Sequence, residues 1–164
     1  MPLQDYAKKR EFDKTPEPPA KEAPKSAGKE PIFVIHEHHA SHLHYDLRLE
    51  RDGVLKSWAI PKEPPLAQGI KRLAVHVEDH PLDYAKFEGT IPEGQYGAGK
   101  VMIWDSGTYL AEKFLENEII AEFNGKKLSG KYVLIKTQFK GAKNSWLFFK
   151  QSLKKLRVSE SETR

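Results

Sequence analysis

Short runs of apolar and aromatic residues, separated by turn residues, constrain the fold of this chain more than any other feature of its sequence. The runs include IFVI, LKSWAIP, RLAVHVE, KYVLIKTQ and SWLFFKQ, with Gly, Pro or Asp between them. Short runs rich in Val, Ile, Tyr, Trp and Phe are typical of strands, and several in series are typical of a barrel or a sandwich. The sequence therefore predicts a mostly β protein: a single antiparallel, barrel-like domain with few short helices.

Length and composition limit the chain to one such domain. Its 164 residues are 38% hydrophobic and 10% aromatic, enough for one moderate core. Residues 13–30 read DKTPEPPAKEAPKSAGKE, a stretch without aromatic or branched apolar residues. Such a stretch buries too little apolar surface to offset the conformational entropy lost when it becomes ordered. We therefore expect a flexible, basic and Pro-rich N-terminal arm over residues 1–30 that contributes little to the core, the barrel domain over 31–153 and a polar tail over 154–164.

One segment does not fit the strand pattern. Residues 111–123, AEKFLENEIIAEF, have less regular apolar spacing and are compatible with either a helix or a pair of strands.

The charge and the absence of cysteine narrow the class of partner and of metal site. The chain carries 27 Lys and Arg against 23 Asp and Glu, a net charge of +4, which permits a polyanionic partner without requiring one. It has no cysteine, so a metal must bind to His, Asp, Glu or backbone oxygens. The polar N-terminus is no secretory signal, and no run approaches the ~18 apolar residues of a spanning helix. We expect a cytoplasmic protein without membrane contact.

Histidines concentrate in one short segment. The chain has seven, and five of them fall within residues 36–44. Alternate side chains of a strand share a face, so His42, His44, Asp46, Arg48 and Glu50 point one way, and the leucines and the tyrosine between them point the other way. One face of this strand is expected to be core, and the other carries imidazoles with a carboxylate two residues on, as a divalent metal site requires.

The presence of Arg48 on that face favours a functional site. A cation beside a structural metal does not stabilise it. A site that binds a metal and a phosphate oxygen together is stabilised by a nearby cation. The alternative is a surface tract of histidines that binds metal adventitiously. Spacing alone does not choose His38 over His39 or His42 as a ligand.

Two further segments bear on the site. In HVEDHPLDY, Pro81 ends a strand, so His80 lies at a strand end, where catalytic groups are commonly displayed. An ordinary turn histidine is the alternative at this position. IPEGQYGAG, residues 91–99, lacks the spacing of a nucleotide-binding P-loop, and its glycines are expected to form tight turns.

The string HHASHLHYDLRLERDGVLKSWAIPK, followed by KRLAVHVEDHPLDYAKFEGTIPEGQYGAGKVMIWDSGTY, resembles the 3'-phosphoesterase domain of the bacterial DNA ligase D family. This domain also occurs as freestanding archaeal and bacterial proteins. The resemblance runs roughly from Tyr6 to Lys150, and its motifs are long and specific.

The resemblance implies a role for nine residues. A divalent metal, preferably Mn²⁺, would be held by His38, His44 and Asp46. Arg48, His80 and Tyr84 would complete the catalytic site. Lys62, Arg72 and Arg10 would face the phosphate. The family pattern leaves His36 and His39 as extra imidazoles, which would bind surplus metal or alter the choice of metal.

The reaction implied by the resemblance is the healing of nucleic acid 3' ends. The enzyme would remove a terminal 3' ribonucleoside as a phosphodiesterase and a 3'-phosphate as a phosphomonoesterase, leaving a 3'-hydroxyl. Its substrates would be DNA or RNA–DNA primer-template ends, and separate ligase, polymerase and end-binding repair proteins would act with it at the nucleoid. Two alternatives stay open: a non-catalytic module that binds DNA ends, and a cupin-like metalloenzyme that acts on a small molecule.

Overall fold

The computed structural model describes residues 2–21, 30–138 and 143–151. Within them, two short helices accompany nine strands: α1 (Leu3–Lys8) and the 3-10 helix η1 (Leu82–Lys86). The strands are β1 (Ile32–His39), β2 (Leu43–Arg51), β3 (Val54–Ile60), β4 (Lys71–Pro81), β5 (Gly89–Ile91), β6 (Gly99–Phe114), β7 (Glu118–Gly125), β8 (Ser129–Lys136) and β9 (Ser145–Lys150). The mostly β content predicted from the sequence is confirmed.

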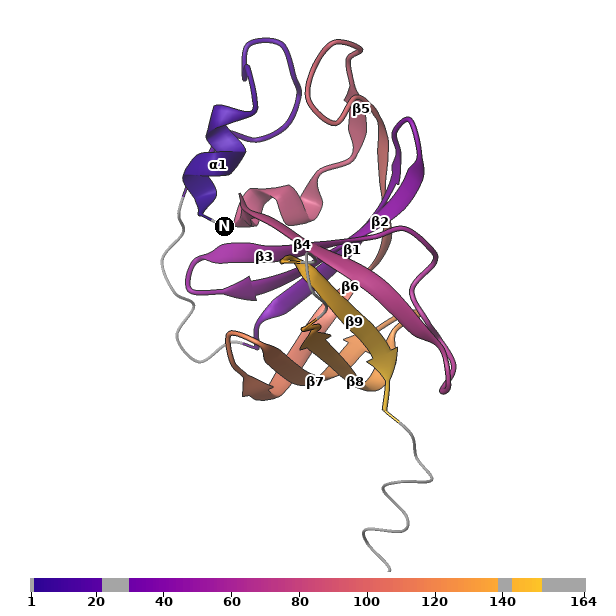
Figure 1. Cartoon of the computed structure of the whole chain (residues 1–164). Helices are drawn as coiled ribbons and strands as arrows, with labels where there is room; N and C mark the ends of the chain where they lie inside the picture. The colour runs from indigo at the N-terminus through magenta and orange to yellow at the C-terminus, as the bar shows by residue number, and fades with distance from the viewer. Residues whose placement is uncertain (1, 22–29, 139–142, 152–164) are drawn as a thin grey trace, which may run out of the picture.

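The sheet closes into an antiparallel barrel. Its strand order is β1-β2-β3-β4-β9-β8-β7-β6, and β1 pairs with β6 to complete the ring, while β5 adds to β6 outside it (Figure 1). The tight turn between β2 and β3 has φ of 54° at Asp52 and 82° at Gly53, the backbone that two-residue hairpins favour. Closure removes the open edges of the sheet, so the predicted single barrel-like domain is confirmed.

Alternation along β1 and β2 separates the core from a second, outer surface. Leu47 and Leu49 are fully buried in the barrel interior, and Asp46 and Arg48, which alternate with them along β2, point to the outer face, as the sequence predicts. A second apolar cluster, which includes Tyr6, Val34, Leu55 and Tyr84, covers part of this outer face. The helices α1 and η1 lie over the same side of the barrel (Figure 1).

Residues 111–123 are strands. β6 continues to Phe114, and β7 begins at Glu118, with Phe114 paired to Ile119 across the turn. The backbone N–H of Leu115 donates to the carbonyl of Glu118 at 2.8 Å. The irregular apolar spacing has a physical cause, because the register shifts between Ala111 and Lys113 and the alternation is broken there.

The N-terminal segment contributes more to the core than its composition indicates. The Tyr6 side chain is fully buried, and its hydroxyl donates to the carbonyl of Pro18 at 2.5 Å. Thr15 and Glu17 are also buried, so the expectation of little core over residues 1–30 is corrected for residues 2–21. Composition misled because a few residues, Tyr6 with Leu3, Phe12 and Ala20 packed around it, attach the segment to the barrel. Residues 22–29 and 154–164 lie outside the described residues, so the linker and the tail stay predictions.

Among the residues that the structure describes, no helix has the length and apolar character needed to cross a membrane.

Candidate active site

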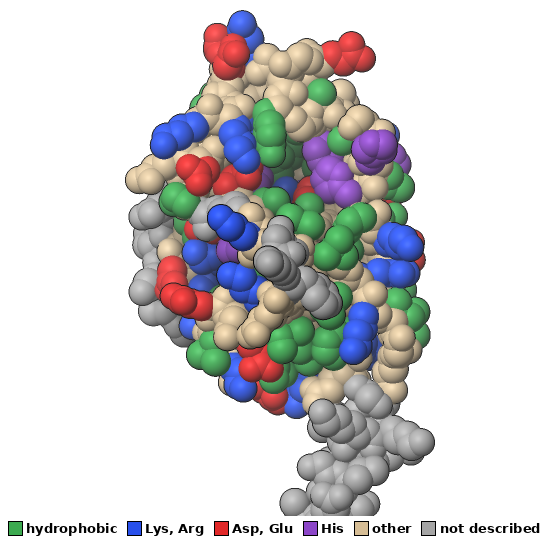
Figure 2. Space-filling view, viewed as in Figure 1, with side chains coloured by type: hydrophobic (Ala, Val, Ile, Leu, Met, Phe, Trp, Pro, Cys, Tyr) green, Lys and Arg blue, Asp and Glu red, His purple; other side chains and the backbone are tan. Residues whose placement is uncertain are grey.

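The hairpin of β1 and β2 brings the predicted metal ligands together on the outer face of the barrel. Its register pairs His38 with His44 and His36 with Asp46. A cavity of about 350 Å³ opens over this hairpin, and histidine side chains lie at the rim of a hollow on the face seen in Figure 2. The cavity is lined by Arg10, His38, Ala40, His44, Asp46, Arg48, Ala59, Val77, Glu78, His80, Tyr84, Ile91, Tyr96 and Gly97.

Three side chains in this cavity have the geometry of a metal site. His38 Nδ1 lies 3.7 Å from one Asp46 carboxylate oxygen, and His44 Nε2 lies 3.3 Å from the other. One ligand atom from each of the three residues falls within 4.8 Å of the others. Two imidazoles and a carboxylate, without a thiolate, suit an exchangeable divalent ion.

Backbone carbonyls orient both imidazoles. His38 Nε2 donates to the carbonyl of Gly97 at 2.6 Å, and His44 Nδ1 donates to the carbonyl of His42 at 3.2 Å. Because a carbonyl oxygen can only accept, these bonds fix a proton on His38 Nε2 and on His44 Nδ1. They direct the other ring nitrogens, His38 Nδ1 and His44 Nε2, toward Asp46, where a metal would replace any proton shared with the carboxylate. Such outer contacts are the usual support of a metal-binding histidine. The glycine-rich loop thus has a role beyond its turns, which its spacing did not reveal.

The charge state of Asp46 also suits a ligand. Burial raises the pKa of this carboxyl, but the Arg48 guanidinium and hydrogen bonds with His38 and His44 outweigh burial and hold the pKa well below its usual range. An Arg48 terminal nitrogen lies 3.4 Å from an Asp46 oxygen. Asp46 is therefore ionised at neutral pH.

Arg48 is held on three further sides. Its Nε donates to His36 Nδ1 at 3.2 Å and a terminal nitrogen donates to Ser57 Oγ at 3.0 Å. The guanidinium carbon lies 4.8 Å from the centre of the Tyr84 ring. With a side chain only 4% exposed, Arg48 has a fixed position at the floor of the cavity.

His36 is the partner that sequence reasoning missed. Its Nε2 donates to the carbonyl of Phe87 at 3.0 Å, so its Nδ1 is free to accept from Arg48. Burial, with the nearby Arg48 charge, lowers the pKa of His36 to about 3. Both ring nitrogens are engaged, which corrects the expectation that His36 binds surplus metal. His39 differs, since it is exposed and its Nε2 contacts Glu37 at 2.6 Å.

His80 stands at the end of β4, as the proline after it predicted. Its Nδ1 donates to the carbonyl of Glu78 at 3.0 Å, and its Nε2 lies 3.5 Å from an Arg10 nitrogen. Burial, together with Arg48 and Arg10, lowers the pKa of His80 well below its usual value. The imidazole is therefore neutral, and its Nε2 is an acceptor at the cavity.

Tyr84 lies in η1 and connects the barrel to the N-terminal segment. Its hydroxyl donates to a Glu17 carboxylate oxygen at 2.6 Å, and its ring meets the His80 ring edge-on at 4.7 Å between centres. Burial, with the nearby Glu17 charge, raises the pKa of Tyr84 well above its usual value. The phenol is consequently a donor, not an anion.

The N-terminal segment supplies Arg10 and the carboxylate of Glu17, and Arg10 also meets Glu78 of β4; sequence reasoning selected neither carboxylate. Arg10 Nε lies 2.9 Å from Glu17, and a terminal nitrogen lies 3.4 Å from Glu78. Lys9 lies 3.0 Å from the other oxygen of Glu78. No periodicity marks Glu17, because its partners are 7 and 67 residues away in the chain.

Two predicted phosphate contacts lie elsewhere. Lys62 is exposed on the connection between β3 and β4, and Arg72, at the start of β4, donates from Nε to the carbonyl of Glu63 at 2.8 Å. Neither lines the cavity. Both lie toward the His44 end of the sheet, because Ile60 of β3 pairs with Tyr45.

Comparisons with known proteins identify relatives of this chain. The family model described as DNA Ligase D 3'-phosphoesterase domain matches residues 36–136. The chain is 47% identical over 154 residues to the multifunctional non-homologous end joining protein LigD of Pseudomonas aeruginosa, covering 91% of this chain and 18% of that protein. For the protein of the same name from Mycolicibacterium smegmatis, identity is 52% over 156 residues, covering 88% of this chain and 20% of the relative. The chain thus spans about a fifth of the length of these relatives.

Proposed function

The chain belongs to the DNA ligase D 3'-phosphoesterase family, and from this premise we propose that it is a metal-dependent hydrolase that heals nucleic acid 3' ends. It would remove a terminal 3' ribonucleoside as a phosphodiesterase and then the 3'-phosphate as a phosphomonoesterase. The observation that carries the proposal is the convergence of His38, His44 and Asp46 with Arg48 and His80 in one cavity. Cations and imidazoles in one place suit an anionic ester.

The metal would be held by the two imidazoles and the carboxylate, and we propose Mn²⁺. The set combines nitrogen and oxygen ligands without sulfur, and hard carboxylate ligands suit Mn²⁺. When bound, such an ion supplies Lewis-acid polarisation of a phosphate oxygen. The tautomers fixed by Gly97 and His42 keep the ligand atoms of His38 and His44 aimed into the cavity.

The remaining side chains would act on the phosphate directly. Arg48 and Arg10 neutralise charge on its oxygens, and preorganised charges of this kind are usually the largest catalytic contribution. A bound phosphate would raise the proton affinity of His80, so its Nε2 would take up a proton from solvent and donate it to the leaving oxygen. Tyr84, whose hydroxyl is engaged by Glu17, positions Arg48 and His80.

Lys62 and Arg72 would serve the substrate at a distance from the reacting group. Both lie near the connection between β3 and β4, toward the His44 end of the cavity. We propose that they contact the strand beyond its terminal phosphate, where basic side chains add affinity without taking part in the reaction.

The setting of the reaction is also proposed. The relatives are named for non-homologous end joining, so we propose that this chain acts on DNA or RNA–DNA primer-template ends in that repair process. A ligase, a polymerase and an end-binding protein would use the resulting 3'-hydroxyl. A cytoplasmic location, at the nucleoid during repair, stays a prediction.

One experiment separates this proposal from a DNA-end-binding module and from a cupin-like enzyme of small molecules. Oligonucleotides ending in a 3'-phosphate or a 3' ribonucleoside are incubated with the chain, with and without Mn²⁺, and the ends are analysed. We expect Mn²⁺-dependent conversion of both. Asp46→Asn should abolish conversion and calorimetric Mn²⁺ binding, whereas Asp13→Asn, the same change at an exposed aspartate, should leave both intact. Oligonucleotide binding without conversion would support the DNA-end-binding module. No oligonucleotide binding at all would leave the cupin-like enzyme of small molecules.

A further inference from the structure

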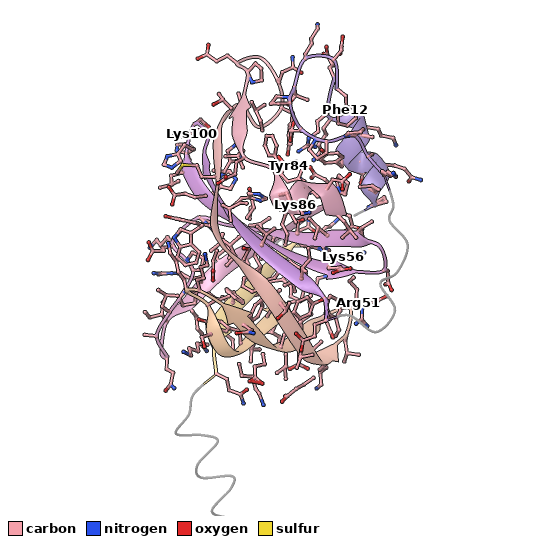
Figure 3. The ribbon with its side chains drawn as sticks, turned by 180° about the vertical axis from the view of Figure 1, so that it is seen from behind. Phe12, Arg51, Lys56, Tyr84, Lys86 and Lys100 are labelled. Atoms are coloured by element: carbon pink, nitrogen blue, oxygen red, sulfur yellow. The ribbon has the colours of Figure 1, made fainter. Side chains whose placement is uncertain are left out.

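Tyr96 is an exposed aromatic residue at the edge of the active-site cavity, and the reaction proposed above gives it no role. It lines the cavity, is 48% exposed, and belongs to neither apolar cluster of the described residues. The glycine-rich loop that carries it faces the N-terminal segment. In Figure 3, Tyr84 lies between Phe12 of that segment and Lys100, which follows the loop. Single exposed aromatic residues are common on protein surfaces, but this one stands beside the groups proposed to hold a metal and a phosphate.

The glycine-rich loop fixes the backbone of Tyr96 relative to the metal ligands. The N–H of Ala98 donates to the carbonyl of Gln95 at 3.1 Å, which closes a turn around Tyr96. Gly97 has a φ of 77°, a backbone conformation that favours glycine. Its carbonyl accepts from His38 Nε2 at 2.6 Å. The residue next to Tyr96 in the chain is therefore bonded to a proposed metal ligand.

Two cations of the N-terminal segment reach the same ring. Lys9 Nζ lies 4.9 Å from the centre of the Tyr96 ring and 3.5 Å from its hydroxyl. The guanidinium carbon of Arg10 lies 5.2 Å from the ring centre. A half-exposed ring beside positive charge suits a nucleotide, because a base can stack on the ring while the cations contact a phosphate.

Tyr96 lies far from the residues proposed to contact the rest of the strand. Its hydroxyl contacts Lys9, which pairs with Glu78 at 3.0 Å. Arg72 and Glu78 are six residues apart on β4, roughly 20 Å at about 3.3 Å per residue. A strand that enters over Lys62 and Arg72, with its terminal phosphate at the metal ligands, would carry its last nucleoside toward Tyr96.

We propose that Tyr96 is a stacking platform for the base of the terminal 3' ribonucleoside, the part of the substrate that leaves in the diester reaction. This inference rests on the proposed function, because it assigns a further part of the same cavity. Every base has a π face, so such a contact accepts any base. A strand that ends in a 3'-phosphate has no base beyond that phosphate. Tyr96 therefore favours ribonucleoside ends over phosphate ends.

Fluorescence of the terminal base tests the stacking without turnover. The oligonucleotide ends in a ribonucleoside whose base is 2-aminopurine, which is quenched when it stacks on an aromatic ring, and an abasic nucleotide precedes it. A chelator keeps the strand intact during the titration. We expect quenching by the full chain and by Tyr96→Phe, which keeps the ring and removes the hydroxyl near Lys9. Tyr96→Leu should not quench.

Hydrolysis with Mn²⁺ tests the specificity. The value of kcat/KM is measured on strands that end in adenosine, in a ribose without a base, or in a 3'-phosphate. Tyr96→Leu should lower the value for the adenosine end about 5- to 150-fold, as the loss of about 1–3 kcal/mol per stacked base implies. The preference for adenosine over the baseless ribose should disappear with it. Leu115→Ala, at a 53% exposed residue in the turn between β6 and β7, is the control and should keep this preference.

Four results would overturn the stacking role. They are no quenching by the full chain, equal quenching by Tyr96→Leu, a Tyr96→Phe protein that behaves as Tyr96→Leu does, and an equal loss on the 3'-phosphate end in Tyr96→Leu. The third would assign the effect to the contact between the hydroxyl and Lys9, and the fourth to the retained part of the strand. Quenching by the full chain without hydrolysis of any end would refute the proposed function and support the platform.

Discussion

The contact between His36 and Arg48 gives the sharpest prediction. His36→Leu keeps a side chain of similar size but removes the acceptor of Arg48 Nε and the donor to the Phe87 carbonyl. A hydrogen bond to a charged group contributes about 1.5–3 kcal/mol. If this energy is lost from the transition state because the guanidinium is misplaced, the rate falls roughly 10- to 100-fold. The unpaired Phe87 carbonyl adds a loss of about 1–3 kcal/mol in the free energy of unfolding.

His36→Gln is the matched rescue. A glutamine can donate from its amide nitrogen to Phe87 and accept at its amide oxygen from Arg48, so we expect most of the rate to return. The assay is the single-turnover rate on a 3'-phosphorylated oligonucleotide at saturating Mn²⁺, with thermal unfolding of each variant. His39→Leu, at an exposed histidine, is the control. A folded His36→Leu protein with a normal rate, or a His36→Gln protein as slow as His36→Leu, would refute the positioning role.

Three further predictions follow from the same structure. Deleting residues 2–21 should lower the free energy of unfolding by at least about 1.5–3 kcal/mol, which is the contribution expected from burial of the Tyr6 side chain alone. A chemical denaturation midpoint equal to that of the full chain would contradict this. Acid should destabilise the protein, because folding lowers the pKa of His36 from 6.5 to about 3. The unfolded state therefore binds more protons than the folded state between those pH values. The free energy of unfolding decreases as the pH falls through that window. His36→Gln should show a weaker decline over that window in pH-dependent denaturation, and an identical decline would refute it. His44→Ala should lose at least ~100-fold in rate as a metal ligand, whereas His42→Ala should lose little, since the structure uses its carbonyl; equal losses in single-turnover assays would make His42 a ligand.

Strand periodicity predicted the part of the site that lies within one strand. It placed His44, Asp46 and Arg48 on one face of β2 and Tyr45, Leu47 and Leu49 on the core face, and the structure agrees. Leu43, assigned to the same core face, is instead 45% exposed. Periodicity carries this information because side chains alternate along a strand whatever it pairs with. It did not choose His38, which comes from a neighbouring strand whose register depends on the turn between them.

The sequence pattern could not predict contacts between segments that are distant in the chain. Glu17 sits in a Pro-rich stretch, and nothing local indicates that it meets Tyr84. The role of His36 was equally hidden, because it is defined by a carbonyl 51 residues later in the chain. His36 was expected to bind surplus metal or alter the choice of metal because the family pattern left it unassigned, whereas the bonds of its two nitrogens decide its role.

The alternation of β1 and β2 also determines how this hairpin can change during evolution. Each successive position faces a different demand: Leu47 must fit the packed interior, and Arg48 beside it must retain its chemistry. Inserting one residue within β2 would exchange the two faces, so that leucines would enter the cavity and charges would enter the core. Length variation is therefore confined to the connections between strands, while within β2 tolerated substitutions should recur at every second position.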